Sequence, residues 1–168
     1  IGLCEACTLG NMRTDSVPPS HRNFDKLKPL EEFGIDPVPL STKTVDGGTV
    51  ITLGVDYGTK LMFAYESKTD GQQTVTMAKV KRDWCDKYGH TTKTVHTDSA
   101  SYFVGEEFKE YCLAQGITHD ASAPYAHQHN LVEGSCVRIV MDRARVLLAD
   151  SGLPASFAGH AIRAAIQS

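Results

Sequence analysis

Short runs of hydrophobic residues occur three times in the first half of the chain, and each run predicts a β-strand. The runs lie at residues 33–36, 49–56 and 61–66. The segments Asp46-Gly47-Gly48 and Gly58-Thr59 between them have the composition of short turns. The pattern therefore predicts three consecutive antiparallel strands.

Helical and strand patterns alternate in the rest of the chain. Residues 72–88 place Met77, Val80, Trp84 and Tyr88 on one helical stripe, and Gly89 supplies a stop signal. The other predicted elements are a strand at 92–97, a helix at 106–115, a short strand around 117–118, and helices at 135–150 and 154–166. Together these elements predict an α/β fold, a mixed five-stranded sheet flanked by helices.

Length and composition fit one compact domain. The chain has 168 residues, 41% of them hydrophobic, which is enough for a substantial core. No run approaches the roughly 20 apolar residues that span a bilayer, and no signal-peptide pattern precedes Cys4. We therefore expect an intracellular protein with no membrane partner. The start at Ile1 without Met favours a piece of a longer polyprotein.

The charge balance is mildly acidic. A net charge of −3 and a pI near 6.2 argue against a clamp that binds nucleic acid over the whole surface, because backbone binding depends on Lys and Arg. An acidic site can hide local basic surface, for which seven residues are candidates. They are Lys79, Lys81, Arg82, Lys93, Arg138, Arg143 and Arg145. For most of them a solvated helix face is the simpler interpretation.

Two carboxylates follow strand patterns, and a third stands at a helix entrance. Asp36 closes the first run, Asp98 follows the extended run 95–97, and Glu133 precedes the helical pattern that begins at residue 135. Carboxylates about 4 Å apart repel by roughly 1 kcal/mol in water and about 4 kcal/mol at an effective dielectric of 20. Hard divalent cations, Mg²⁺ or Mn²⁺, would keep such a cluster ionised, and two of them support phosphoryl transfer on nucleic acid.

Several motifs stand in a particular order along nearly the whole chain. They are Cys4-Glu5-Ala6-Cys7, Lys28-Pro29-Leu30-Glu31, Gly34-Ile35-Asp36, Val55-Asp56-Tyr57, His96-Thr97-Asp98, Gly116-Ile117-Thr118-His119, Ala123-Pro124-Tyr125, Ala144-Arg145 and Gly152-Leu153-Pro154. Their order and spacing resemble the integrase of copia-type LTR retrotransposons, a member of the retroviral integrase group with a ribonuclease H-like core.

The resemblance implies a function and a set of partners. It implies DNA 3′-end processing and strand transfer, the reactions of a polynucleotidyl transferase that inserts a retrotransposon. Asp36, Asp98 and Glu133 would be the Mg²⁺-binding or Mn²⁺-binding catalytic triad, and the partners would be DNA, both element ends and target, and further copies of the chain in a homo-oligomer. An active protein of this kind would work in the nucleus.

Further residues receive roles through the same resemblance. Tyr125, Gln128 and Asn130 lie in the loop that approaches the DNA end in this family, and Arg138 is the basic candidate beside it. Residues 1–28 would be a remnant of a zinc-binding N-terminal region plus a linker, and residues 29–168 the integrase catalytic core.

The chain departs from the family at the third carboxylate. The family usually has 35 residues between its second Asp and its Glu, whereas 34 separate Asp98 from Glu133, and an ungapped count places Gly134 at the Glu position. One position on a helix means about 100° of rotation. Two hypotheses remain open: an active integrase, or a catalytically inactive ribonuclease H-like scaffold that binds nucleic acid or protein. A nuclease of the same fold is a weaker third.

Cysteine and proline usage adds two expectations. Cys4 and Cys7 form half of a zinc site, whose other ligands would lie outside this chain, whereas Cys85, Cys112 and Cys136 are expected to be buried free thiols. Pro37 lacks a backbone N–H, so we expect it at a strand end or edge.

Overall fold

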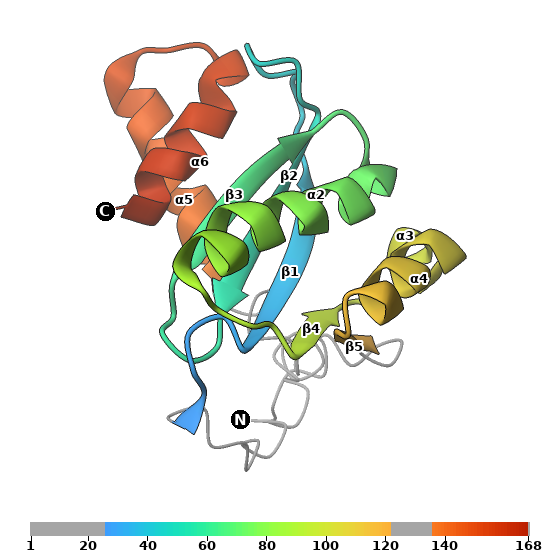
Figure 1. Ribbon diagram of the computed structural model, residues 1–168. Coiled ribbons are helices and arrows are strands. Elements are labelled where there is room, and N and C mark those ends of the chain that lie inside the picture. The colour runs from blue at the N-terminus through green and yellow to red at the C-terminus, as the bar shows by residue number, and fades with distance from the viewer. Residues whose placement is uncertain (1–25, 122–135, 168) are drawn as a thin grey trace, which may run out of the picture.

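A five-stranded mixed sheet forms the centre of the molecule (Figure 1). The computed structural model describes residues 26–121 and 136–167. The strands are β1 (Glu32–Pro39), β2 (Val50–Asp56), β3 (Met62–Ser67), β4 (Thr94–Thr97) and β5 (Thr118–Ala121), in the spatial order β3-β2-β1-β4-β5. The first three are antiparallel, and β4 and β5 join parallel to β1. The predicted α/β fold is confirmed and agrees with a ribonuclease H-like architecture.

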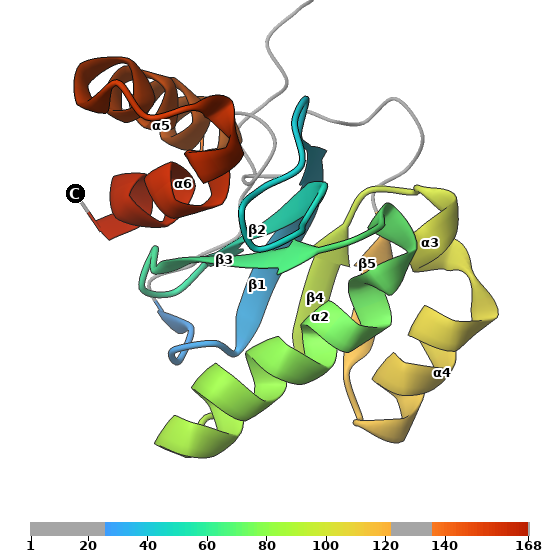
Figure 2. The same cartoon turned by 90° about the horizontal axis from the view of Figure 1, so that it is seen from above.

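Helices cover both faces of the sheet (Figure 2). One face carries α2 (Gln73–Val80), the π-helical segment η3 (Lys81–Asp86), α3 (Ser101–Val104) and α4 (Glu106–Ala114). The other carries α5 (Val137–Ser151) and α6 (Ala158–Gln167), and the short 3₁₀ segments η2 (Asp70–Gln72) and η6 (Ala155–Phe157) precede α2 and α6. Because both faces are covered, every residue of β2 is buried.

Alternate residues along each strand enter two different cores. Phe33 and Ile35 of β1 and Val95 of β4 pack against α2, α3 and α4 in the first core. Ile51 and Leu53 of β2 pack against α5 and α6 in the second. The helix predicted at 135–150 is confirmed as α5, and Val137, Val140, Met141, Ala144 and Leu148 form its apolar side, because all belong to the second core or pack against it.

The largest departure from the predicted elements is the helix at 72–88. It begins as a 3₁₀ turn and changes to π-helical winding at Lys81, which alters the number of residues per turn. Met77 and Val80 are buried, whereas Trp84 is half-buried and Tyr88 is 55% exposed. The stripe therefore fails at its end, since a uniform helical period does not hold across the π segment.

Smaller differences concern α3 and β5. Helix α3 was not predicted, and β5 spans Thr118–Ala121 rather than the residues around 117–118, because Ile117 is buried in the core just before the strand. Cys85 and Cys112 are buried free thiols as expected, whereas Cys136 is only partly buried.

Pro37 lies inside β1, a central strand, rather than at a strand end. It pairs with Thr52 of β2, but the pairing of β1 with β4 involves only residues 32–34. Beyond Gly34, β1 is paired on one side, so a residue without an N–H is tolerated there. Of the two expected positions, the strand end is therefore wrong and the edge is confirmed, because this stretch of β1 has a partner strand on one side only.

Candidate active site

The register of β1 and β4 ends two residues before Asp36 and Asp98. Glu32 pairs with Thr94, Phe33 with Val95 and Gly34 with His96 in parallel alignment. Continuing this alignment by two residues places Asp36 opposite Asp98. Paired residues point to the same face, and neighbouring strands lie about 4.8 Å apart. Both aspartates are half-buried.

Asp36 lies on the sheet face that carries α5 and α6, and the alternation along β4, continued past Thr97, predicts the same face for Asp98. Phe33, Ile35 and Val95 point into the opposite core, so the residues that alternate with them, Asp36 and His96 among them, point to the α5/α6 side. On this side the helices pack against Ile51 and Leu53 of β2. Figure 2 shows α5 and α6 over the β2 and β3 half of the face, with β4 and β5 beyond them.

Hydrogen bonds at the end of β4 hold the backbone around Asp98. The Ala100 N–H donates to Asp98 Oδ1 at 3.1 Å, and the Thr97 hydroxyl donates to the Asp98 carbonyl oxygen at 2.7 Å. Thr97 Oγ1 also lies 2.8 Å from His119 Nε2 on the far side of the sheet, where burial lowers the pKa of His119. The carboxylate is thus placed by the turn that follows β4.

A cluster of polar side chains surrounds His96, two residues before Asp98. His96 is 6% exposed, with Nδ1 2.9 Å from Asp120 Oδ2 of β5 and Nε2 3.4 Å from Glu32 Oε2 of β1. The Tyr57 ring stacks on the imidazole with 5.0 Å between centroids. Cys136 and Val137, at the start of α5, pack against the buried pair of Val55 and Tyr57, so α5 begins close to the residue that stacks on His96.

Comparison with known proteins gives two informative relatives, whereas no family model matches. The chain is 26% identical over 163 residues to a retrovirus-related Pol polyprotein from transposon TNT 1-94 of Nicotiana tabacum, covering 96% of this chain and 12% of that protein. It is 28% identical over 131 residues to a Pro-Pol polyprotein of simian foamy virus type 3 (strain LK3), covering 76% and 11%. These relatives support a retrotransposon integrase-type region. The resemblance inferred from the motifs is confirmed at this level.

The structure describes only part of the site predicted for this integrase-type region. Asp36, Asp98 and Arg138 are described, and Arg138 is exposed on the first turn of α5. The other predicted site residues lie outside the described residues; they are Glu133, Tyr125, Gln128, Asn130, Cys4 and Cys7. Within residues 26–121 and 136–167, no three His, Cys, Asp or Glu side chains are grouped to hold a metal ion.

Several of the candidate basic residues are paired with acids. Lys81 bonds Asp86 at 2.7 Å, and Arg82 bonds Asp83 at 2.6 Å. Lys93 likewise pairs with Glu31, and Arg145 with Asp142. These pairs are mostly exposed and stabilise little, but they neutralise charge that phosphates would otherwise contact. The interpretation of most of these cations as solvated surface residues fits this arrangement.

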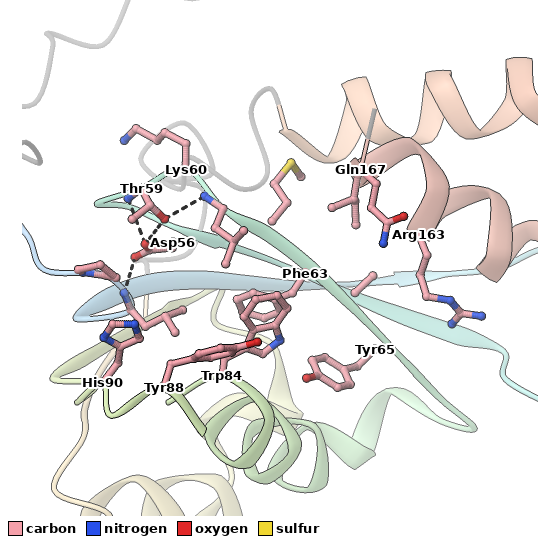
Figure 3. Close-up of a pocket in the computed structure, with 16 residues that line it drawn as sticks. Asp56, Thr59, Lys60, Phe63, Tyr65, Trp84, Tyr88, His90, Arg163 and Gln167 are labelled. Carbon is pink, nitrogen blue, oxygen red and sulfur yellow. Dashed lines mark hydrogen bonds between the residues drawn. The ribbon is translucent and has the colours of Figure 1, made fainter. Parts of the chain in front are cut away.

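A hollow of about 780 Å³ lies beside β3, far along the sheet from β5 (Figure 3). Phe63 and Tyr65 of β3, Trp84 and Arg163 are among its lining residues. The buried Asp56 carboxylate at one end accepts hydrogen bonds from the Leu30 and Thr59 N–H groups at 3.0 Å and from the Thr59 hydroxyl. Asp56, the last residue of β2, thus holds the β2–β3 turn in place. This structural role sets it apart from Asp36 and Asp98.

The lengths and hydropathies of the described helices decide whether any of them could span a membrane. None in this part of the chain is long and apolar enough to cross a bilayer.

Proposed function

We propose that this integrase-type region catalyses phosphoryl transfer on DNA, with Asp36 and Asp98 binding Mg²⁺ or Mn²⁺. The observation that supports the proposal is the parallel β1–β4 register, whose last pair, Gly34 and His96, lies two residues before each acid. The carboxylates of Asp36 and Asp98 are suitable ligands for Mg²⁺ or Mn²⁺, because such hard cations prefer carboxylate oxygens, with water and substrate phosphate completing the coordination.

Different elements of the fold hold Asp36 and Asp98. Asp36 is carried by a central strand, and Asp98 by the turn anchored through the Ala100 N–H. Glu133, the proposed third ligand, precedes α5 in the sequence and lies outside the described residues. Cations held by these acids would supply the activation of water or a DNA 3′-hydroxyl and the stabilisation of the leaving oxygen that end processing and strand transfer require.

The proposal extends to partners and location. Tyr125, Gln128, Asn130 and Arg138 would contact DNA ends, and the protein would act as a homo-oligomer in the nucleus. Zinc bound by Cys4 and Cys7 would need ligands from outside this chain. The chain spans 12% and 11% of the two relatives, so the activity of a whole polyprotein would include other regions.

A nicking assay with a matched variant tests the activity. Asp98→Asn should abolish Mn²⁺-dependent nicking of a DNA end while leaving the circular dichroism spectrum unchanged. Glu110→Gln, on the exposed surface of α4, should nick like the wild type. Retained nicking by Asp98→Asn would reject the assignment. Joining of the end to a second duplex would separate an integrase from a nuclease that only hydrolyses.

A catalytically inactive scaffold is the second candidate. The observation that favours it is the one-residue offset between Glu133 and Gly134 relative to the family spacing. An inactive core that has lost its metal site should show no change in melting temperature when millimolar Mg²⁺ or Mn²⁺ is added, because a ligand of the native state stabilises it by mass action. A clear rise in melting temperature with the metal would contradict this candidate.

A further inference from the structure

His96 links the three strands that surround the proposed site. It lies on β4, with Glu32 of β1 on one side and Asp120 of β5 on the other. Each ring nitrogen faces one carboxylate, Nδ1 at 2.9 Å and Nε2 at 3.4 Å. Since the side chain is only 8% exposed, water has little access to replace either contact.

The imidazole is also held across its face. Tyr57, which is 3% exposed, stacks on it at an interplanar angle of 22°. The Tyr57 N–H donates to the Glu32 carbonyl oxygen at 2.9 Å, so the residue that covers the ring is tied to the strand that supplies one of its carboxylates. The ring therefore has little freedom to rotate or shift.

The contacts of His96 with Glu32 and Asp120, here called the His96 bridge, lie where the backbone pairing of β1 and β4 ends. Gly34 and His96 are the last pair in the parallel alignment of β1 and β4, and Asp36 and Asp98 lie two residues farther on. The strand alignment alone thus ends before the two carboxylates. The His96 bridge fixes the spacing of β1, β4 and β5 at the last aligned pair, on the same face as the aspartates.

We infer that His96 is a positioning residue, which sets the separation of the Asp36 and Asp98 carboxylates by holding β1 and β5 against β4. The inference rests on the proposed function, because its expected effect on metal affinity requires that Asp36 and Asp98 bind Mg²⁺ or Mn²⁺. Mg²⁺ demands near-ideal octahedral geometry at about 2.0–2.1 Å, so a small change in carboxylate separation weakens binding. Residues that orient metal ligands typically change metal affinity by about 10–100-fold when replaced.

Replacement of His96 separates its polar contacts from its packing. His96→Phe keeps a ring to stack on Tyr57 but loses both nitrogens, and His96→Asn keeps a donor near the Nδ1 position. By isothermal titration calorimetry, His96→Phe should raise the Mn²⁺ dissociation constant at least tenfold. His96→Asn should raise it less, and saturating Mn²⁺ should restore much of the nicking rate to both variants. If His96→Phe does not fold, Asp120→Asn weakens the same contact from the β5 side and should also raise the Mn²⁺ dissociation constant.

A metal-independent measurement distinguishes this inference from the proposed function. Hydrogen exchange of the Ala100 amide reports the position of the Asp98 carboxylate, which accepts its hydrogen bond. In EDTA, His96→Phe should exchange this amide at least tenfold faster, whereas amides in α6 should be unchanged. Faster exchange in a protein whose wild type binds no Mn²⁺ would refute the proposed function and support the positioning role. Unchanged exchange and unchanged Mn²⁺ affinity in folded variants would overturn the inference.

Discussion

Removal of one carboxylate from the Asp36–Asp98 pair should stabilise the metal-free protein. Two charges about 5 Å apart, near the spacing of adjacent strands, repel by about 1 kcal/mol in water and about 3 kcal/mol at an effective dielectric of 20. Both residues are half-buried, so the effect should lie between these limits. The Asn side chain in Asp98→Asn retains an oxygen that can accept the Ala100 N–H bond. In EDTA, the variant should therefore be more stable than the wild type by about 1–3 kcal/mol.

Divalent cations should cancel or reverse that difference. At a Mn²⁺ concentration of about 100 times its dissociation constant, the wild type gains about 2.7 kcal/mol of unfolding free energy by mass action. Asp98→Asn should gain much less because it has lost a ligand. Urea unfolding followed by circular dichroism, with EDTA or with Mn²⁺, measures all four free energies.

The control for this experiment is Glu110→Gln, which removes an exposed carboxylate from α4 on the other face of the sheet. Its unfolding free energy should stay within about 0.5 kcal/mol of the wild type in both conditions, as is usual for surface substitutions. If Asp98→Asn is no more stable than the wild type in EDTA and both proteins respond equally to Mn²⁺, then the two acids do not form a repelling, metal-binding pair.

Three other changes test separate parts of the molecule. In Gly159→Ala the new methyl group overlaps the Glu66 carboxylate, which is held by Thr44 and Arg163, so urea unfolding should show a loss of about 1–3 kcal/mol; an unchanged stability would mean that the Glu66 side chain moves aside freely. Burial lowers the pKa of His119, whereas the unfolded chain binds a proton near pH 6.5, so stability should fall between pH 7 and pH 5. His119→Gln should make that decline shallower by up to about 1.4 kcal/mol per pH unit, and identical slopes would count against the shift. Finally, Glu133→Ala combined with Gly134→Glu should raise Mn²⁺-dependent nicking if the family spacing defines the third ligand, and lower it if Glu133 already does.

The strands were predictable because their hydrophobic runs are short and bounded by turn residues. The three antiparallel strands lie within one or two residues of the predicted ranges, apart from the extension of β1 to Pro39. The π-helical winding of η3 was not predictable from a uniform period, so Tyr88 was assigned to a stripe that it leaves. The His96 bridge was also missed, because its partners Glu32 and Asp120 come from two other strands and meet it only through the parallel register.

The same reasoning explains why the three proposed metal ligands differ in how well the sequence defines them. Asp36 follows buried residues at alternating positions, so its face is fixed once Phe33 and Ile35 enter the core. A one-residue slip of a strand would expose that whole set, so burial itself enforces the register. Asp98 directly follows β4, whose register is fixed in the same way, and the Ala100 N–H holds its carboxylate in the turn. A carboxylate at a helix entrance has no such constraint, because the preceding loop can absorb one residue, while each residue on the helix turns a side chain by about 100°. Burial patterns thus define the strand positions from which Asp36 and Asp98 are proposed to form a site, and a measurement that reports on the Glu133 carboxylate is needed to decide whether a third ligand completes it.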